Sequence, residues 1–221
     1  MPDAVIFDLD GVLLDSEQGW NAAKEELVRE MGGCWRDDAP TAMMGMSSRE
    51  WAAYLRDELG VPLDADVISQ DVAGRMLEGY RRGLPLLPGA VQSVRALSAR
   101  WPLGLASSSN REVIELVLEL AGFRAAFQAA ISSEEVARGK PAPDVYLAVA
   151  ERLGAEPARC VAIEDSSNGL RAAAAAEMAV IAVPNPHYPP EEDALALAVE
   201  VVTGVGEVTP DVVQRAITRI Q

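Results

Sequence analysis

The chain has 221 residues, of which 49% are hydrophobic and 24% charged, a composition typical of a globular protein that buries a substantial core. Its formal net charge of -15 argues against binding to nucleic acid or to an anionic membrane, which needs many basic side chains. It has two cysteines, no N-terminal signal pattern and no apolar stretch of membrane-spanning length. We therefore expect a cytoplasmic monomer or weak homodimer without nucleic-acid or membrane partners.

The first motif lies near the start of the chain. Residues 4–7 are apolar and favour a buried parallel strand, which is followed at once by Asp8, Asp10 and Gly11. Two carboxylates this close repel each other, and their burial requires a compensating positive charge. A hard divalent cation fits because only oxygen ligands are present. Taken alone, the motif leaves open a solvated acidic turn.

Helical spacing dominates the next part of the chain. It predicts helices over residues 17–31, 47–59 and 64–82, without a convincing strand between them. Glycines at 32, 33, 60 and 83 and a proline at 85 supply stop signals. The pattern predicts that residues 16–84 form an inserted helical domain, with 1–15 and 85–221 as the α/β core.

From residue 87 onward, predicted helices and strands alternate. The helices are expected at 91–99, 110–121, 143–153, 168–176 and 211–220, and the strands at 103–106, 129–131, 161–163, 180–183 and 199–202. Single helices between successive strands indicate a doubly wound, Rossmann-like parallel sheet with right-handed crossovers.

Polar residues gather where ligands bind in such a sheet, beyond the carboxyl ends of the strands. Helix capping could explain the serines, the helix dipole could explain the acids, and a surface position could explain the lysine. Lysine is scarce, however, with only Lys24 and Lys140 in the chain. Convergence on one rim favours a single site made of Asp8, Asp10, Ser107, Ser108, Ser109, Asn110, Lys140, Glu164 and Asp165.

Four segments in this order, VIFDLDGVLLDSE, LASSSN, GKPAPDVY and IEDSSNGL, resemble motifs of the haloacid dehalogenase superfamily. The likeness is to its phosphatase and β-phosphoglucomutase-like branch, which carries a helical cap after the first motif. This resemblance implies that Asp8 is the nucleophile and Asp10 the general acid/base. It also implies that Ser107 and Lys140 hold the transferring phosphoryl group and that a Mg²⁺ site is formed by Asp8, Asp10, Glu164 and Asp165.

The residue types suit phosphoryl transfer. A carboxylate can attack phosphorus to form an aspartyl-phosphate, and Mg²⁺ reduces the repulsion between the two anions. A second carboxyl with a raised pKa can protonate the leaving oxygen and later activate water. We expect a Mg²⁺-dependent phosphatase acting on a small phosphorylated metabolite, such as a sugar phosphate. Dehalogenation and phosphonate cleavage are both disfavoured, because Asp10 stands where those branches lack an acid. Phosphonate cleavage would also need an imine, and Lys24 is the only lysine of the cap that could form it.

Substrate choice is expected to depend on the helical insert. In the segment 45–49, a capped helix start and Arg49 suit a second anionic group, with Ser108, Ser109 and Asn110 as further substrate contacts. The alternative is a plain capped helix with an exposed arginine.

Two other functions remain as hypotheses. A phosphomutase is disfavoured because those enzymes carry a histidine roughly where Trp20 stands, and the sole histidine, His187, is expected in a distant loop. A non-catalytic phosphate-accepting switch, similar to the receiver domains of response regulators, is also disfavoured, because those domains are shorter and lack a helical insert.

Overall fold

The computed structural model, which describes residues 1–44 and 46–219, has the predicted parallel α/β architecture. Six strands pair in the order β3-β2-β1-β4-β5-β6, and every pair is parallel. The order reverses at β1, which lies between β2 and β4, and such a reversal opens a crevice at the carboxyl ends of the strands. The strands are β1 (Ala4–Phe7), β2 (Leu103–Ser107), β3 (Phe127–Ser132), β4 (Cys160–Glu164), β5 (Ala179–Ala182) and β6 (Glu200–Val201).

Strand β1 is buried on both faces because it lies in the middle of the sheet. Successive side chains of a strand point to opposite faces. Val5 and Phe7 join one hydrophobic cluster, whereas Ala4 and Ile6 join the other. The continuous apolar run of this strand therefore follows from having helices on both sides.

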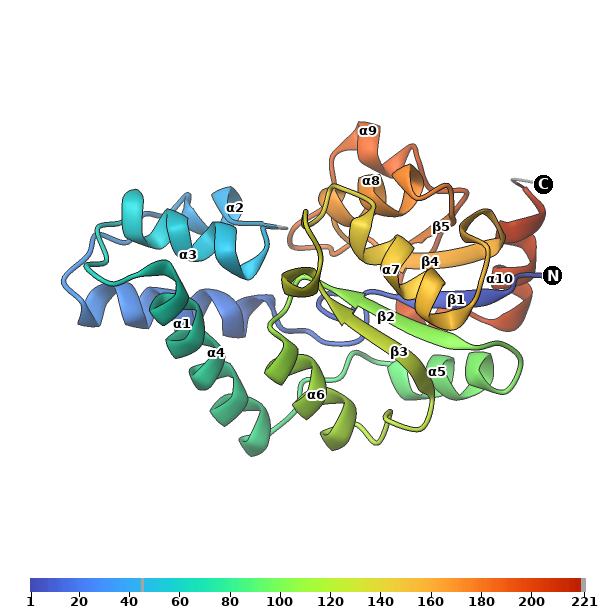
Figure 1. Ribbon diagram of the computed structural model, residues 1–221, viewed down its shortest axis with the longest axis horizontal. Coiled ribbons are helices and arrows are strands. Elements are labelled where there is room, and N and C mark those ends of the chain that lie inside the picture. The colour runs from blue at the N-terminus through green and yellow to red at the C-terminus, as the bar shows by residue number, and fades with distance from the viewer. Residues whose placement is uncertain (45, 220–221) are drawn as a thin grey trace.

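Helices cover both faces of the sheet (Figure 1). One face packs against α5 (Ala90–Ser98), α6 (Arg111–Leu120) and α10 (Pro210–Thr218). The other packs against α7 (Asp144–Leu153) and α8 (Ser167–Ala175), and α9 (Glu192–Leu195) lies beside α8. Short 3₁₀ helices occupy Ser133–Glu135, Pro157–Arg159 and Val205–Glu207.

The helical block lies beyond the carboxyl end of β1, in blue to teal in Figure 1. It contains α1 (Glu17–Glu30), α2 (Ala39–Ala42), α3 (Ser48–Asp57) and α4 (Ala65–Arg82), and α4 packs against both α1 and α3. At the start of α3, Ser47 and Glu50 form a capping box, in which the Ser47 amide donates to Glu50 Oε2 at 2.8 Å.

Two chain segments, residues 13–15 and 85–87, connect this block to the sheet, and we call them the neck. They run side by side with an antiparallel bridge between Leu14 and Leu86. The amide of Asp15 donates to the carbonyl of Pro85 at 2.8 Å, and the amide of Leu87 donates to the carbonyl of Leu13 at 2.9 Å. The chain thus leaves and re-enters the sheet domain at adjacent points.

The predicted helices and strands are present, with bounds that differ by a few residues. The four-residue helices α2 and α9 were not predicted, since one helical turn gives no periodic pattern. The predicted end of the last helix at residue 220 lies outside the described residues. In the described part of the chain, no helix has the length and apolar character needed to cross a bilayer, and Cys34 and Cys160 are both free.

Candidate active site

The turn after β1 places the first two acids at the rim of the sheet. Asp8 is buried and its amide donates to the carbonyl of Ile163 at 3.0 Å, which continues the pairing of β1 with β4. Gly11 then turns the chain with φ at +76°. A Cβ atom on Gly11 would lie 1.9 Å from Asp165 Oδ2. Only glycine allows both this backbone conformation and the close approach of Asp165.

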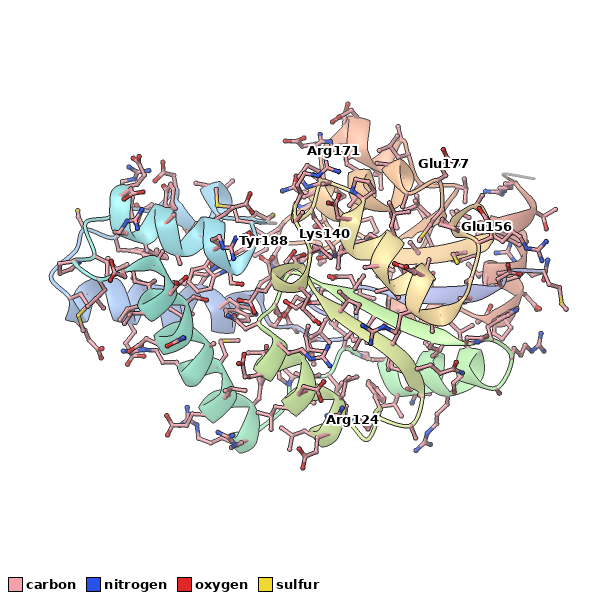
Figure 2. The ribbon with its side chains drawn as sticks, viewed as in Figure 1. Arg124, Lys140, Glu156, Arg171, Glu177 and Tyr188 are labelled. Carbon is pink, nitrogen blue, oxygen red and sulfur yellow. The ribbon has the colours of Figure 1, made fainter. Side chains whose placement is uncertain are left out.

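Lys140 connects the acids of two strands. Its Nζ donates to Asp8 Oδ1 at 2.7 Å, to Glu164 Oε1 at 2.5 Å and to the carbonyl of Ala106 at 3.1 Å. The side chain is only 4% exposed. In Figure 2, Lys140 lies at the junction between the sheet and the helical block. All three donors of this ammonium are therefore used to hold β1, β2 and β4 together at the rim.

The carboxylate of Glu164 is fully buried and accepts hydrogen bonds on both oxygens. Oε1 accepts from Lys140 and from the Tyr146 hydroxyl at 2.8 Å. Oε2 accepts from the amides of Asp165 and Ser166 at 3.1 and 3.4 Å and from the Ser166 hydroxyl at 3.3 Å. Protein donors therefore satisfy this carboxylate, and it orients its neighbours.

The acids at the rim strongly affect each other's protonation. Burial raises the pKa of Asp8 to about 8; Lys140 opposes this shift, while Glu164 and Asp10 add to it. The pKa of Asp165 lies well above its usual range for the same reason, burial, with added repulsion from Glu164 and Asp8. Burial alone would lower the pKa of Lys140, but Asp8 and Glu164 raise it above its usual value. One lysine does not neutralise this cluster of carboxylates.

This excess of negative charge fits a divalent cation. Oxygen atoms of Asp8, Glu164 and Asp165 lie within 4.8 Å of one another, and all three residues are buried. A set of hard oxygen ligands with unrelieved repulsion is the environment that Mg²⁺ prefers. Asp10, the fourth predicted ligand, is not part of this cluster.

The carboxylate of Asp10 is instead held by donors from both parts of the molecule. Ser16 Oγ and Trp20 Nε1 donate to Oδ1 at 2.5 and 3.1 Å. Ser109 Oγ donates to Oδ2 at 2.5 Å. Because Trp20 belongs to α1 and Ser109 follows β2, the orientation of Asp10 depends on the position of the helical block against the sheet.

The polar residues 107–110 at the end of β2 do not all face the cavity. Ser107 is fully buried, and its Oγ accepts from the amide of Ser109 at 3.0 Å. Ser108 and Ser109 line the cavity described below, whereas Asn110 does not. The Asn110 amide group donates to Ser69 of α4 at 2.9 Å and to Glu134 at 2.8 Å. In this conformation Asn110 joins the sheet to the helical block and does not face the cavity.

Arg49 also lies away from the cavity. It is exposed at the start of α3, and its side chain makes no hydrogen bond or ion pair with any residue of 1–44 and 46–219. Gly45, in the segment predicted to contact substrate, lies outside the described residues. The predicted role of Arg49 in binding an anionic group stays a prediction. His187, as expected, is an exposed loop residue.

A partly open cavity of about 100 Å³ lies between the rim of the sheet and the helical block. Most lining residues on the sheet side were predicted, whereas most of those from the helical block were not. Which residues of the block line the cavity depends on which face of each helix turns inward. The cavity is lined by Asp8, Asp10, Ser108, Ser109, Lys140, Asp165 and Ser166 from the sheet side, and by Glu17, Trp20, Asn21, Lys24, Pro40, Met43, Met44, Met46 and Trp51 from the block.

Comparison with known families agrees with this geometry. The model of the haloacid dehalogenase-like hydrolases matches residues 2–177. The chain belongs to this family. The family assignment makes it an enzyme of a hydrolase family.

This haloacid dehalogenase-like hydrolase is similar in sequence to proteins named as phosphatases and in structure to CbbY. Hexitol phosphatase B of Escherichia coli is 36% identical over 189 residues, which are 83% of this chain and 84% of that protein. A probable pseudouridine-5'-phosphatase of Drosophila melanogaster is 31% identical, covering 93% of this chain and 91% of that one. The crystal structure of CbbY from Rhodobacter sphaeroides in complex with phosphate superimposes with a TM-score of 0.87 at 28% identity, covering 97% and 100% of the two chains.

Proposed function

We propose that this enzyme is a Mg²⁺-dependent phosphatase that hydrolyses a small phosphorylated metabolite through an aspartyl-phosphate. The observation that carries the proposal is the arrangement of Asp8, Asp10 and Lys140 around one partly open cavity. Phosphoryl transfer needs an in-line nucleophile and neutralisation of the phosphoryl oxygens, and these groups supply both. Relatives named as phosphatases of hexitol, pseudouridine and fructose phosphates support a substrate of this size.

Asp8 acts as the nucleophile in this proposal. Lys140 binds Oδ1, which leaves Oδ2 to form the bond to phosphorus. The ester oxygen leaves as the P–O bond breaks, and Asp10 gives it a proton. A water molecule then loses a proton to Asp10 and attacks the phosphorus, which releases Asp8 and inorganic phosphate.

Mg²⁺, when bound, supplies positive charge that lowers the repulsion between Asp8 and the phosphoryl oxygens. Asp8 and Asp165 are its proposed direct side-chain ligands. Glu164 fits less well as a direct ligand, because protein donors already bind both of its oxygens. Its proposed role is to orient Lys140 and the backbone at Asp165.

The helical block, residues 16–84, acts as a cap in this proposal. Its apolar residues, including Met43 and Trp51, form the wall opposite the nucleophile. Closing this wall would exclude bulk water and so protect the phosphoenzyme from random attack. Trp20 donates to Asp10, so the acid/base would be correctly held only when the cap is closed.

A phosphomutase is the alternative. It would need the phosphoenzyme to survive until a second substrate hydroxyl arrives. Trp20 occupies the position where a histidine is expected in the mutases, and an indole N–H cannot accept a proton. This residue supports hydrolysis over transfer.

The test of the proposal is the release of phosphate from p-nitrophenyl phosphate with Mg²⁺ present. Asp8→Asn removes the nucleophile and is expected to abolish turnover while circular dichroism stays unchanged. Asp57→Asn is the matched control, since it removes an exposed carboxylate that pairs with the neighbouring Arg56 and does not line the cavity, and it should keep full activity. Full activity of Asp8→Asn would refute the mechanism. Isomerisation of a sugar phosphate, stimulated by a sugar bisphosphate, would favour the mutase.

A further inference from the structure

Lys24 is a buried cation on the cap wall of the cavity. It is only 6% exposed. It lies on α1 together with Glu17, Trp20 and Asn21, and these four residues also line the cavity. Their spacing of three, four and seven residues places them on one face of the helix. The face of α1 that lines the cavity therefore carries three polar side chains, those of Glu17, Asn21 and Lys24, beside the indole of Trp20.

The ammonium of Lys24 has no acceptor within the described part of the chain. It makes no hydrogen bond there, and no carboxylate oxygen lies within 4.0 Å. Its closest partners are two indole rings, with Nζ at 4.9 Å from the centre of Trp51 and 5.9 Å from the centre of Trp20. Cation–π contacts satisfy part of the charge but none of its three N–H donors.

The charged groups that face Lys24 do not replace such an acceptor. Glu17 and Asp10 act on it through space and favour its charged form. Burial outweighs them, so the pKa of Lys24 falls to about 8. The ammonium therefore remains charged at neutral pH and incompletely compensated, a condition that a bound anion would relieve.

We propose that Lys24 binds a second anionic group, a phosphate or a carboxylate, on the part of the substrate that remains after phosphoryl transfer. This inference rests on the proposed phosphatase function and narrows its substrate to doubly anionic compounds. The two lysines of the chain then act on opposite ends of the substrate. On the sheet side, Lys140 beside Asp8 supplies positive charge near the transferring group, and on the cap side Lys24 binds the other anion.

The surrounding charges fix the orientation of such a substrate. Four carboxylates line the cavity, those of Asp8, Asp10, Glu17 and Asp165. They would repel a second anion at most positions on the wall, so the favourable position is against Lys24 and the two indole rings. Asn21 and Glu17, which lie beside Lys24 on α1, offer a donor and acceptors for hydroxyl groups between the two anions.

Matched pairs of ligands that differ by one anionic group test the inference. Full-length Asp8→Asn protein with Mg²⁺ binds without turnover, and calorimetry measures its dissociation constants. One pair is fructose 1,6-bisphosphate and fructose 6-phosphate, and the other is 6-phosphogluconate and sorbitol 6-phosphate, which carries a hydroxymethyl group in place of the carboxylate. We expect the doubly anionic member of at least one pair to bind about tenfold more tightly, which is the contribution of one charge-assisted hydrogen bond. The pair that responds distinguishes phosphate from carboxylate.

Adding Lys24→Met to this protein should remove the preference, and Lys24→Arg should retain much of it. Arg81→Met is the matched control, because it removes an exposed cation of the block that does not line the cavity. The inference is overturned if neither pair shows a preference, if the preference survives Lys24→Met, or if Arg81→Met alone removes it.

The same variants in the Asp8-containing enzyme give a second readout. The ratio of kcat/KM between the two members of the responding pair should fall about tenfold in Lys24→Met. Hydrolysis of p-nitrophenyl phosphate by the unaltered enzyme tests the phosphatase proposal separately. Turnover of that ester with an unchanged ratio in Lys24→Met would reject the second-anion site alone.

Discussion

The two lysines of the chain show how environment decides the behaviour of one side-chain type. Both are almost fully buried, Lys140 at 4% and Lys24 at 6% exposure. Lys140 has two carboxylates at hydrogen-bond distance, and its pKa is raised. Among residues 1–44 and 46–219, Lys24 has only aromatic faces as close partners, and its pKa is lowered. The first is stabilised by its site, whereas the second costs stability until something binds it.

Replacing Lys24 by methionine is therefore expected to stabilise the free enzyme. The pKa of Lys24 is about 8 in the folded chain and 10.5 in the unfolded chain, and this difference corresponds to about 3 kcal/mol. The unfolded chain binds the proton more tightly, so the penalty is complete below pH 8 and disappears as pH rises to 10.5. In urea titrations, Lys24→Met should gain roughly 1–3 kcal/mol at pH 7, and the gain should shrink by pH 10.

The control is Arg81→Met, which removes an exposed cation of α4. It should change the free energy of unfolding by less than about 0.5 kcal/mol at either pH. The assignment of a charged, uncompensated lysine would be contradicted if Lys24→Met lowered the free energy of unfolding at pH 7. It would also be contradicted if the variant changed that free energy by the same amount at pH 7 and pH 10.

The sequence predicted the residues that follow strands better than those on helices. Asp8, Asp10, Lys140 and Asp165 lie around the cavity as their positions after strands suggested. Lys24 was noticed for its rarity and as the cap lysine that an imine would need, but it was not predicted to lie in the site. Its role depends on which face of α1 turns toward the sheet, and that is set by packing against α4 and not by local spacing.

At the scale of elements, the turn between β1 and the neck determines the geometry of the site. It must place Asp8 and Asp10 at the rim and leave room for Asp165, which comes from the end of β4. Gly11 meets both requirements through its positive φ and its missing side chain. A single atom added to Gly11 would disturb both the acids that follow β1 and Asp165, which follows β4.

Gly11→Ala is expected to reduce both stability and activity. Alanine at positive φ costs about 1–2 kcal/mol. Its Cβ would also lie 1.9 Å from Asp165 Oδ2, so the Asp165 carboxylate would have to move away. Gly32→Ala is the matched control, because Gly32 has the same φ of +76° and no atom within 4 Å of the added Cβ. Thermal unfolding and phosphate release measure the difference.

Gly32→Ala should lose only the backbone cost and keep its activity. Equal losses of stability and activity in the two variants would mean that the approach of Asp165 to Gly11 is not important.

The elements themselves were largely predicted, since alternating apolar strands and capped helices have strong local signals. The exceptions have physical reasons. The helices α2 and α9 are four residues long, too short for a periodic pattern. Strand β6 has only two residues at the edge of the sheet, where less burial is required.

At the scale of the whole molecule, the fold gathers acids from two strands, and a lysine from the loop after a third, at one buried point. The prediction of a doubly wound sheet is confirmed, as is membership of the haloacid dehalogenase-like hydrolases. The domain boundaries at residues 16 and 84, the oligomeric state and a cytoplasmic location stay predictions. They depend on motion, partners and context that local sequence patterns do not encode.

Binding of Mg²⁺ should stabilise the entire fold, because the site exists only when β1 and β4 are paired. At a hundredfold excess over the dissociation constant, the gain is about 2.7 kcal/mol, or roughly 5–10 °C in Tm for a chain of this size. Differential scanning fluorimetry with MgCl₂ and with NaCl of equal ionic strength measures it. EDTA should reverse the shift, and Asp165→Asn should reduce it. An equal shift with NaCl would show that general screening, not a specific site, is responsible.

The neck has a consequence for how the molecule can change over evolution. Residues 13–15 and 85–87 are hydrogen-bonded to each other. The helical block between them is therefore attached to the sheet through two neighbouring segments of the chain. We expect that the length and composition of that insert can vary without altering the order or register of the sheet, as long as a donor to Asp10 such as Trp20 is kept. Most of the proposed reacting groups would then stay fixed while the residues that face them from the insert change.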